Sequence, residues 1–274
     1  MKEDITPKIQ ECINEWQLVK GSTEAEILKW ETKTLKTIFP HRFENVEIIL
    51  TDMIQTLLES DTFWSPRSSD PNYSSYFSKT EFNSFMDFFT RELSEQKRTE
   101  IIASSNTAKM IIPNECYVES MGEIKDLNTV ISLKKSCDDV KGIMKNLGFD
   151  LTDYSFINHK LLLTFYHRIH SPVSGVVERI IPYPKEEGVF GDNALWILDI
   201  NTKTQGHVYF MLVGESEIQD FTFLIKEGQE INIFDEIGNF NWGSQTILFY
   251  NTTNFGPTDL VIPTKRFFVG DEVF

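Results

Sequence analysis

The sequence predicts an α+β protein in which a helical N-terminal region, residues 1–95, is followed by a β-rich region, residues 96–274. Apolar residues recur every three or four positions up to about residue 60, which is the period of amphipathic helices. After about Thr99 they occur in short β-branched and aromatic runs separated by Gly, Pro and Asn, which is typical of strands. Hydrophobic residues make up 41% of the 274, enough to bury a large core.

In the N-terminal region the pattern predicts two or three helices over residues 5–60, with breaks near Gly21 and Pro40. Residues 61–79 are rich in Ser, Pro, Asn and Asp and predict a loop. A further helix is expected over residues 80–93. Its apolar face is made by four side chains: Phe82, Phe85, Phe89 and Leu93.

The β-rich region is expected to contain strands near residues 108–113, 173–182, 195–202 and 207–213. One helix, over residues 136–147, is predicted among them because its apolar residues share a face. Few long helices separate the strands, and this argues against a doubly wound parallel sheet.

The composition excludes several classes of function. Lys and Arg total 26 against 41 Asp and Glu, a net charge of -15 that repels polyanions, so nucleic acid is not an expected partner. Three cysteines without CxxC or Cys/His spacing argue against a disulfide scaffold and favour a reducing cytoplasm. The N-terminus lacks a signal-peptide pattern, and every apolar run is shorter than the roughly 18 residues that span a bilayer. An amphipathic stripe at residues 46–58 leaves peripheral membrane contact open, although packing on the β-rich region explains it more simply.

Two of the five histidines lie three residues apart, at His167 and His170. The clustering is informative, although one buried, hydrogen-bonded histidine and one surface histidine explain it as well. An HxxH pair with no third ligand at a recognisable spacing does not indicate a metal, and no metal site is predicted. Gly243 and Ser244 follow a glycine-containing turn and open an apolar run, a pattern that by itself is usual for a structural turn.

Five segments occur in an informative order: Phe88-Phe-Thr-Arg-Glu-Leu, Ile112-Pro-Asn-Glu-Cys-Tyr-Val, Val140-Lys-Gly, Tyr166-His-Arg-Ile-His-Ser-Pro-Val-Ser-Gly, and Lys226-Glu-Gly through Gly238-Asn-Phe-Asn-Trp-Gly-Ser. Each is weak alone. Together, over about residues 85–250, they resemble the phosphatidylserine decarboxylase family of pyruvoyl-dependent decarboxylases, which includes aromatic amino acid decarboxylase-like relatives. The resemblance implies a sandwich-like catalytic domain in a self-cleaving precursor.

The resemblance also implies that the cofactor is made from the chain. Ser244 attacks the carbonyl of Gly243, and an acyl shift and elimination split the chain into residues 1–243 and 244–274. Ser244 becomes a covalent pyruvoyl group. That carbonyl forms a Schiff base with a primary amine and takes up the electrons released as carbon dioxide leaves, as expected of a lyase.

Four residues receive catalytic roles from the same resemblance. His170 is the base for Ser244, and Glu115 orients His170, in the place of the family's Asp-His-Ser triad. His167 is expected near the substrate carboxylate or as the proton donor to the carbanion. The substrate is a small amine-bearing carboxylate, either phosphatidylserine or a soluble amino acid such as tryptophan. Whether the protein forms a homo-oligomer stays open.

Two departures from the family pattern matter. Glu115 and Cys116 stand where the family has Asp-Gly, and a family Asn-Glu-Arg segment reads Asn193-Ala-Leu. These differences support an alternative hypothesis, in which the chain does not cleave and acts as a binding or regulatory protein.

Overall fold

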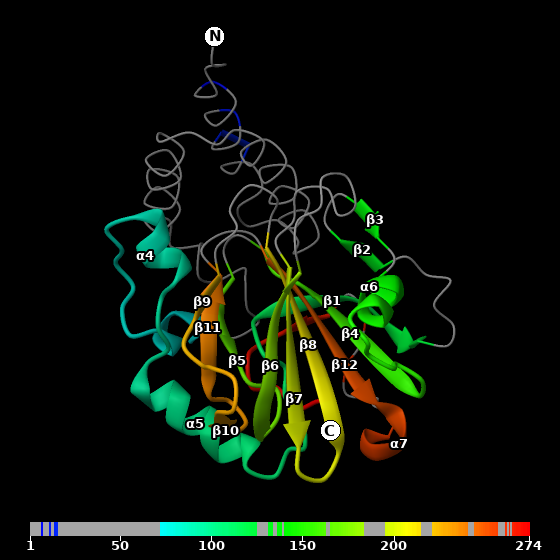
Figure 1. Ribbon diagram of the computed structural model, residues 1–274. Helices are drawn as coiled ribbons and strands as arrows, with labels where there is room; N and C mark the ends of the chain where they lie inside the picture. Colours follow the sequence, from blue (N-terminus) through cyan, green and yellow to red (C-terminus); the bar gives the residue numbers. More distant parts are fainter. Residues whose placement is uncertain are drawn as a thin grey trace. The chain divides into compact units, whose positions relative to one another are not determined.

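The computed structural model describes residues 72–124, 140–162, 165–183, 195–214, 221–240, 244–256 and 265–274, with isolated positions 7, 11, 14, 15, 261 and 263. For residues 131–133 and 136–138, Lys141 and Ser244, the description covers the backbone alone. The chain divides into two compact units, one of residues 1–99 with 162–164 and one of residues 100–161 with 165–274. Figure 1 labels the helices and strands in chain order.

The described part of the first unit is short and aromatic. It contains a 3-10 helix, η1 (Tyr73–Tyr76), and the helix α4 (Phe85–Phe89). Ser84 caps α4, because its side chain accepts a hydrogen bond from a backbone amide of the first turn. Aromatic rings surround the buried Arg91, whose guanidinium carbon lies 4.3 Å from the centre of the Phe77 ring. Cation–π attraction offsets part of the free-energy cost of burying this charge.

The second unit is mostly strands (Figure 1). Its described strands are β1 (Cys116–Glu123), β2 (Ile131–Leu133), β3 (Ser136–Asp138), β4 (Tyr154–Lys160), β5 (Arg168–His170), β6 (Gly175–Tyr183), β7 (Leu195–Thr202), β8 (Gly206–Gly214), β9 (Phe221–Phe223), β10 (Glu230–Ile231), β11 (Glu236–Phe240), β12 (Ser244–Asn251) and β13 (Arg266–Phe267). Its helices are α6 (Val140–Asn146) and α7 (Thr252–Phe255), and α5 (Glu95–Ser105) runs across the boundary between the units.

Eight strands form one sheet in the order β10-β6-β7-β8-β12-β4-β1-β13. All of its pairs are antiparallel. Alternate side chains of a strand point to the same face, and on one face they form an apolar core with α6. Members of this core are Ile143, Met144, Phe156, Ile197, Met211, Ile247 and Phe249. Burying each such side chain contributes about 1.5–3 kcal/mol.

A second sheet has the order β5-β11-β9. The ring of Trp196, on β7, lies 6.2 Å from the rings of Phe221 and Phe223 on β9. These aromatic contacts pack the small sheet against the large one. The small sheet bears on the predicted site, because β5 contains His170 and β11 ends four residues before Ser244.

The prediction of a β-rich region after residue 99 is confirmed, and the antiparallel pairing agrees with the argument against a doubly wound sheet. The strand predicted over residues 195–202 is β7, and those predicted near 173–182 and 207–213 are β6 and β8. Residues 108–113 are not a full strand, since only Ile111 forms an isolated bridge. The helix predicted over 136–147 is α6, preceded by β3.

The helices differ more from prediction. The helix expected over residues 80–93 is limited to α4, because Ser84 caps its start and residue 93 forms an extended bridge with Phe77. The sequence did not indicate α5, whose surface is mostly polar. The helices expected over residues 5–60, including the stripe at 46–58, lie outside the described residues apart from isolated positions. Within the described part of the chain, no helix combines the length and the apolar character needed to cross a membrane.

Candidate active site

Hydrogen bonds bring the segments of Glu115 and His170 together in the second unit. The backbone N–H of His170 donates to the carbonyl of Pro113 at 2.8 Å, two residues before Glu115. The backbone N–H of Tyr166 donates to Oε2 of Glu115, also at 2.8 Å. Two segments about fifty residues apart in the chain therefore meet at this point.

The end of β11 and the start of β12 each contact this region. Thr246 Oγ1 donates to Oδ1 of Asn114 at 2.9 Å, and Asn114 is the residue before Glu115. The N–H of Phe240 donates to the carbonyl of His167 at 3.3 Å. Ser244 lies between these two contacts, four residues after Phe240 and two before Thr246. The two contacts thus flank, in the sequence, the position at which cleavage is predicted.

Ser244 opens β12 opposite Gly214 of β8, at the junction between the turn and the strand. Gly243, the other half of the predicted cleavage site, lies outside the described residues. The backbone thus places Ser244 at the first position of β12, a central strand of the large sheet.

His170 is fully buried and contacts two aromatic rings. Its ring stacks on Phe234, with the centroids 4.3 Å apart and the planes 5° apart, and more loosely on Tyr166. Nδ1 lies 2.8 Å from the carbonyl of Phe234, which can only accept, so Nδ1 carries the proton. Nε2 then accepts a hydrogen bond from the Tyr166 hydroxyl at 2.9 Å. This tautomer places the basic lone pair of His170 on Nε2.

The position of the Phe234 carbonyl depends on an unusual backbone conformation. Phe234 has a φ of 70°, in the left-handed region that bulky side chains rarely adopt. Such a conformation costs about 1–3 kcal/mol and is found where surrounding structure imposes it. Here the stacking on His170 and the bond from its Nδ1 favour the conformation.

Glu115 is a buried carboxylate that is paired and hydrogen-bonded. Oε1 accepts from Nε of Arg266 at 3.0 Å and from a terminal nitrogen of the same guanidinium. The side chain of Glu115 is 0% exposed and that of Arg266 is 13% exposed, so water screens the pair weakly. The guanidinium also lies over the Phe165 ring at 4.7 Å. Tyr166 therefore connects the two predicted triad members, through its amide to Glu115 and its hydroxyl to His170.

His167 is 1% exposed, and its Nδ1 lies 2.8 Å from the carbonyl of Phe165. Because a carbonyl only accepts, this nitrogen is the protonated one and Nε2 holds the lone pair. The two histidines thus share a tautomer although they have different partners.

Sequence reasoning missed three residues of this site. Tyr166 belongs to the motif that contains both histidines, but the motif gave it no role. Arg266 is one of only four basic residues between positions 201 and 274, a signal that pointed to it weakly. No sequence pattern indicated the backbone conformation of Phe234.

A separate group of possible metal ligands lies on β6, β7 and β8. Ligand atoms of Glu178, Asp199 and His207 lie within 4.8 Å of one another. Asp199 already accepts from Arg179 at 2.8 and 3.0 Å and contacts Nδ1 of His207 at 2.6 Å. Arg179 supplies the positive charge that a metal ion would supply, so an ion pair explains the group.

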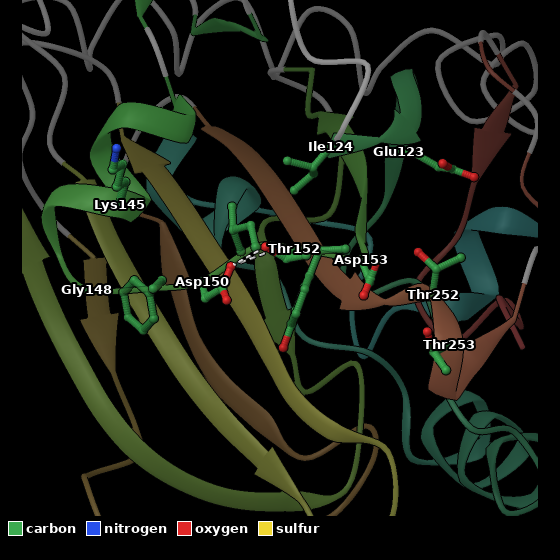
Figure 2. A pocket seen from close by; sticks show the side chains of 12 residues that line it. Glu123, Ile124, Lys145, Gly148, Asp150, Thr152, Asp153, Thr252 and Thr253 are labelled. Atoms are coloured by element: carbon green, nitrogen blue, oxygen red, sulfur yellow. Dashed lines mark hydrogen bonds between the residues drawn. The ribbon is translucent and has the colours of Figure 1, made fainter.

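A cavity of about 850 Å³ lies beyond the opposite end of β12 from Ser244. Figure 2 shows Glu123, Asp153 and Thr252 on one side of it, with Lys145 and Asp150 on the other. The eight residues of β12 span roughly 25 Å, so this cavity is distinct from the predicted site. Its three carboxylates outnumber its single lysine, which disfavours an anionic ligand there.

Comparison with known proteins agrees with this geometry. A family model described as Phosphatidylserine decarboxylase matches residues 85–274, more than two thirds of the chain. The chain belongs to the phosphatidylserine decarboxylase family. The match includes every segment that surrounds Ser244, and it confirms the resemblance identified from the motifs.

Similar proteins within and around this family carry two kinds of name. A phosphatidylserine decarboxylase proenzyme of Clostridium tetani is 27% identical over 64% of this chain and 62% of its own length. An L-tryptophan decarboxylase of Psilocybe cyanescens is 24% identical over 60% of this chain and 45% of its own length. A phosphatidylserine decarboxylase proenzyme 2 of Komagataella phaffii is 32% identical over 37% of this chain. That last match spans 10% of the relative's length. The chain therefore covers less than two thirds of the length of each of these three proteins.

In phosphatidylserine decarboxylase terms, the main departure is at Glu115 and Cys116. Cys116 is fully buried, and burial raises the pKa of its thiol well above the ordinary value. The thiol therefore stays protonated and acts as a small apolar group. Glu115 is longer by one methylene than aspartate, and its Oε1 binds Arg266.

Proposed function

We propose that this protein is a pyruvoyl-dependent decarboxylase that cleaves itself between Gly243 and Ser244. The observation that carries the proposal is the set of hydrogen bonds that joins the segments of Glu115, His167 and His170 to one another and to Phe240 and Thr246, which precede and follow Ser244 in the chain. These segments contain the family's motifs, and the family includes decarboxylase proenzymes.

In this proposal Ser244 Oγ attacks the carbonyl carbon of Gly243 while His170 accepts the hydroxyl proton. The acyl group moves from nitrogen to oxygen, which leaves an ester and a free amine on residue 244. Loss of the Cα proton then expels the Gly243 carboxylate and leaves dehydroalanine. Addition of one water and loss of one ammonia convert that residue into a pyruvoyl group.

The residues around β12 suit such a group. His170 and His167 each have one nitrogen held by a backbone carbonyl, so their tautomers are fixed and each keeps a lone pair on Nε2. Aromatic rings contact the buried His170, so little water competes with Ser244 for its ring. When present, the pyruvoyl carbonyl supplies an electron sink for decarboxylation. His167 is proposed to contact the substrate carboxylate or to return a proton after carbon dioxide leaves.

The substrate class is a primary amine that carries a carboxylate. Both kinds of relative act, by their names, on such compounds, either phosphatidylserine or tryptophan. The net charge of -15 disfavours docking on an anionic lipid surface and favours a soluble amino acid, although a local patch can override it. We place the reaction in a reducing compartment such as the cytoplasm, since three cysteines give no disulfide framework.

A second candidate function is that of a non-cleaving family member that binds or regulates another protein. The observation in its favour is the Tyr166 hydroxyl, which occupies Nε2 of His170, the atom that a base would use on Ser244. The two candidates differ in one product, the shorter chain.

Intact-mass spectrometry of the purified protein tests the proposal without any guess about substrate. Cleavage predicts two masses, and the smaller one equals residues 244–274 lighter by one ammonia. The Ser244→Ala variant is the control and should give one full-length mass. A single full-length mass for the wild-type chain would exclude the proposal in favour of the non-cleaving candidate.

A further inference from the structure

We propose that His159 is a positioning residue for self-cleavage. With Thr246 and Asn114 it forms a buried chain of hydrogen bonds that fixes the start of β12 against the segment that carries Glu115. The inference rests on the proposed function, because it concerns the same cleavage at Ser244. His159 belongs to none of the segments that identified the family.

The hydrogen-bond directions in this chain follow from one hydroxyl proton. Thr246 Oγ1 donates its proton to Oδ1 of Asn114 at 2.9 Å. The same oxygen lies 3.0 Å from Nδ1 of His159, so it must accept there and His159 must donate. All three residues are 0% exposed, and water therefore does not compete for these bonds.

These hydrogen bonds lie close in sequence to two of the predicted site residues, Ser244 and Glu115. His159 lies directly opposite Thr246 in the antiparallel pairing of β4 with β12. Thr246 is two residues from Ser244, and Asn114 is next to Glu115. Residues diagonal to each other on paired strands lie roughly 7–8 Å apart, which is the relation of His159 to position 244.

The other ring nitrogen of His159, Nε2, makes the arrangement energetically unfavourable in one respect. Nε2 of His159 is buried and has no hydrogen-bond partner among the described residues. Burial lowers the pKa of His159 to about 3, so the ring is neutral and Nε2 is an acceptor. An unsatisfied buried acceptor is unfavourable, and a phenylalanine of similar size would avoid it. The bond that Nδ1 donates to Thr246 explains why a histidine is suitable here.

Self-cleavage needs this kind of positioning. Serine must approach the carbonyl of its own preceding peptide, and an error of about 1 Å in such a geometry can slow a reaction about a hundredfold. After cleavage, residue 244 is a chain end that only non-covalent contacts hold. The hydrogen bond between Thr246 and Asn114 holds the start of β12 against the segment of Glu115, both before and after the chain is cleaved.

Two matched pairs of variants test the inference. Thr246→Val removes the hydroxyl at nearly constant shape, and Thr246→Ser keeps it. His159→Phe removes the donor, and His159→Asn offers an amide nitrogen near the position of Nδ1. The rate of chain splitting is followed by intact mass. The same substitutions in the Ser244→Ala background, where no splitting is expected, give melting temperatures, so that rates are compared where every variant is folded.

We expect Thr246→Val and His159→Phe to slow splitting about tenfold or more, the effect of losing a buried hydrogen bond near the reacting atoms. Thr246→Ser and His159→Asn should stay within about threefold of wild type, a rescue that loss of packing alone would not produce. Hydroxylamine cleaves esters and spares amides. It should not split the slow variants, because the inference places the defect before the ester forms.

Three results would overturn the inference while the proposed function stands. These are wild-type rates in folded Thr246→Val and His159→Phe, equal slowing in both members of each pair, and rapid splitting of the slow variants by hydroxylamine. A wild-type chain that never splits would instead overturn the proposed function and the inference with it.

Discussion

Replacing Arg266 by methionine should destabilise the second unit strongly, because it leaves the Glu115 carboxylate buried without its cation. Glu115 is 0% exposed and Arg266 is 13% exposed, so solvent cannot take over the role of the guanidinium. Removing one partner of a buried ion pair costs about 3–5 kcal/mol. In a unit of this size each 1 kcal/mol lowers the melting temperature by about 2–4 °C. The expected loss is therefore roughly 6–20 °C.

Urea and thermal unfolding of the Ser244→Ala chain, with and without Arg266→Met, measure this loss in a background where no cleavage is expected. A matched control is the double variant Glu115→Gln with Arg266→Met, in which both charges are absent. It should recover most of the stability, since an uncharged pair leaves no buried ion. If Arg266→Met alone lost less than about 1 kcal/mol, the value typical of exposed pairs, the carboxylate would not depend on Arg266 as we argue.

Three further predictions follow from the same contacts. Ser244→Ala and His170→Ala should each give one intact, inactive chain on a denaturing gel, and normal splitting of His170→Ala would restrict that residue to packing or turnover. Burial holds the folded-state pKa of His159 at about 3, below the ordinary 6.5, so the unfolded chain binds the extra proton between these values. Stability should thus fall by about 1.4 kcal/mol per unit as the pH drops below 6, and His159→Phe should remove this component. Urea unfolding at pH 6 and pH 4 checks it, and equal pH dependence in both chains would contradict the assignment. Gly238→Ala should lower the free energy of unfolding by about 1–3 kcal/mol or more, because its φ is 153° and an added Cβ would lie 2.2 Å from the carbonyl oxygen of Thr222; an unchanged urea midpoint would refute the close approach.

Strands were predictable in the centre of the large sheet, where local pattern and burial agree. In β7 and β8 the apolar runs that predicted strands are buried in the central sheet. The helix over residues 80–93 was less predictable, because in the described part of the first unit aromatic rings with helical spacing are also buried outside a helix. Phe82 has the spacing of a helical face, yet it precedes α4, which starts after its Ser84 cap. Tertiary packing of rings, not helix propensity, explains its burial.

The sequence predicts which residues form the site and says nothing of their contacts. Motif order predicts Glu115, His167, His170 and Ser244, because the motifs are contiguous in sequence. The Arg266 partner of Glu115 lies 151 residues away, and no local pattern links residues over such a distance. The Phe234 carbonyl that fixes His170 depends on a left-handed backbone, which a phenylalanine in the sequence does not suggest.

Glu115 connects Arg266, Tyr166 and His170 through its side chain. Its Oε1 binds Arg266, its Oε2 accepts the amide of Tyr166, and the hydroxyl of that tyrosine donates to Nε2 of His170. Through this connection Glu115 affects the orientation of His170 by fixing the residue that binds it. The non-cleaving candidate keeps the Tyr166 hydroxyl on Nε2 of His170, whereas the cleaving candidate needs that nitrogen for the Ser244 proton. The hydrogen bond between Tyr166 and His170 is thus the contact on which the two candidates differ.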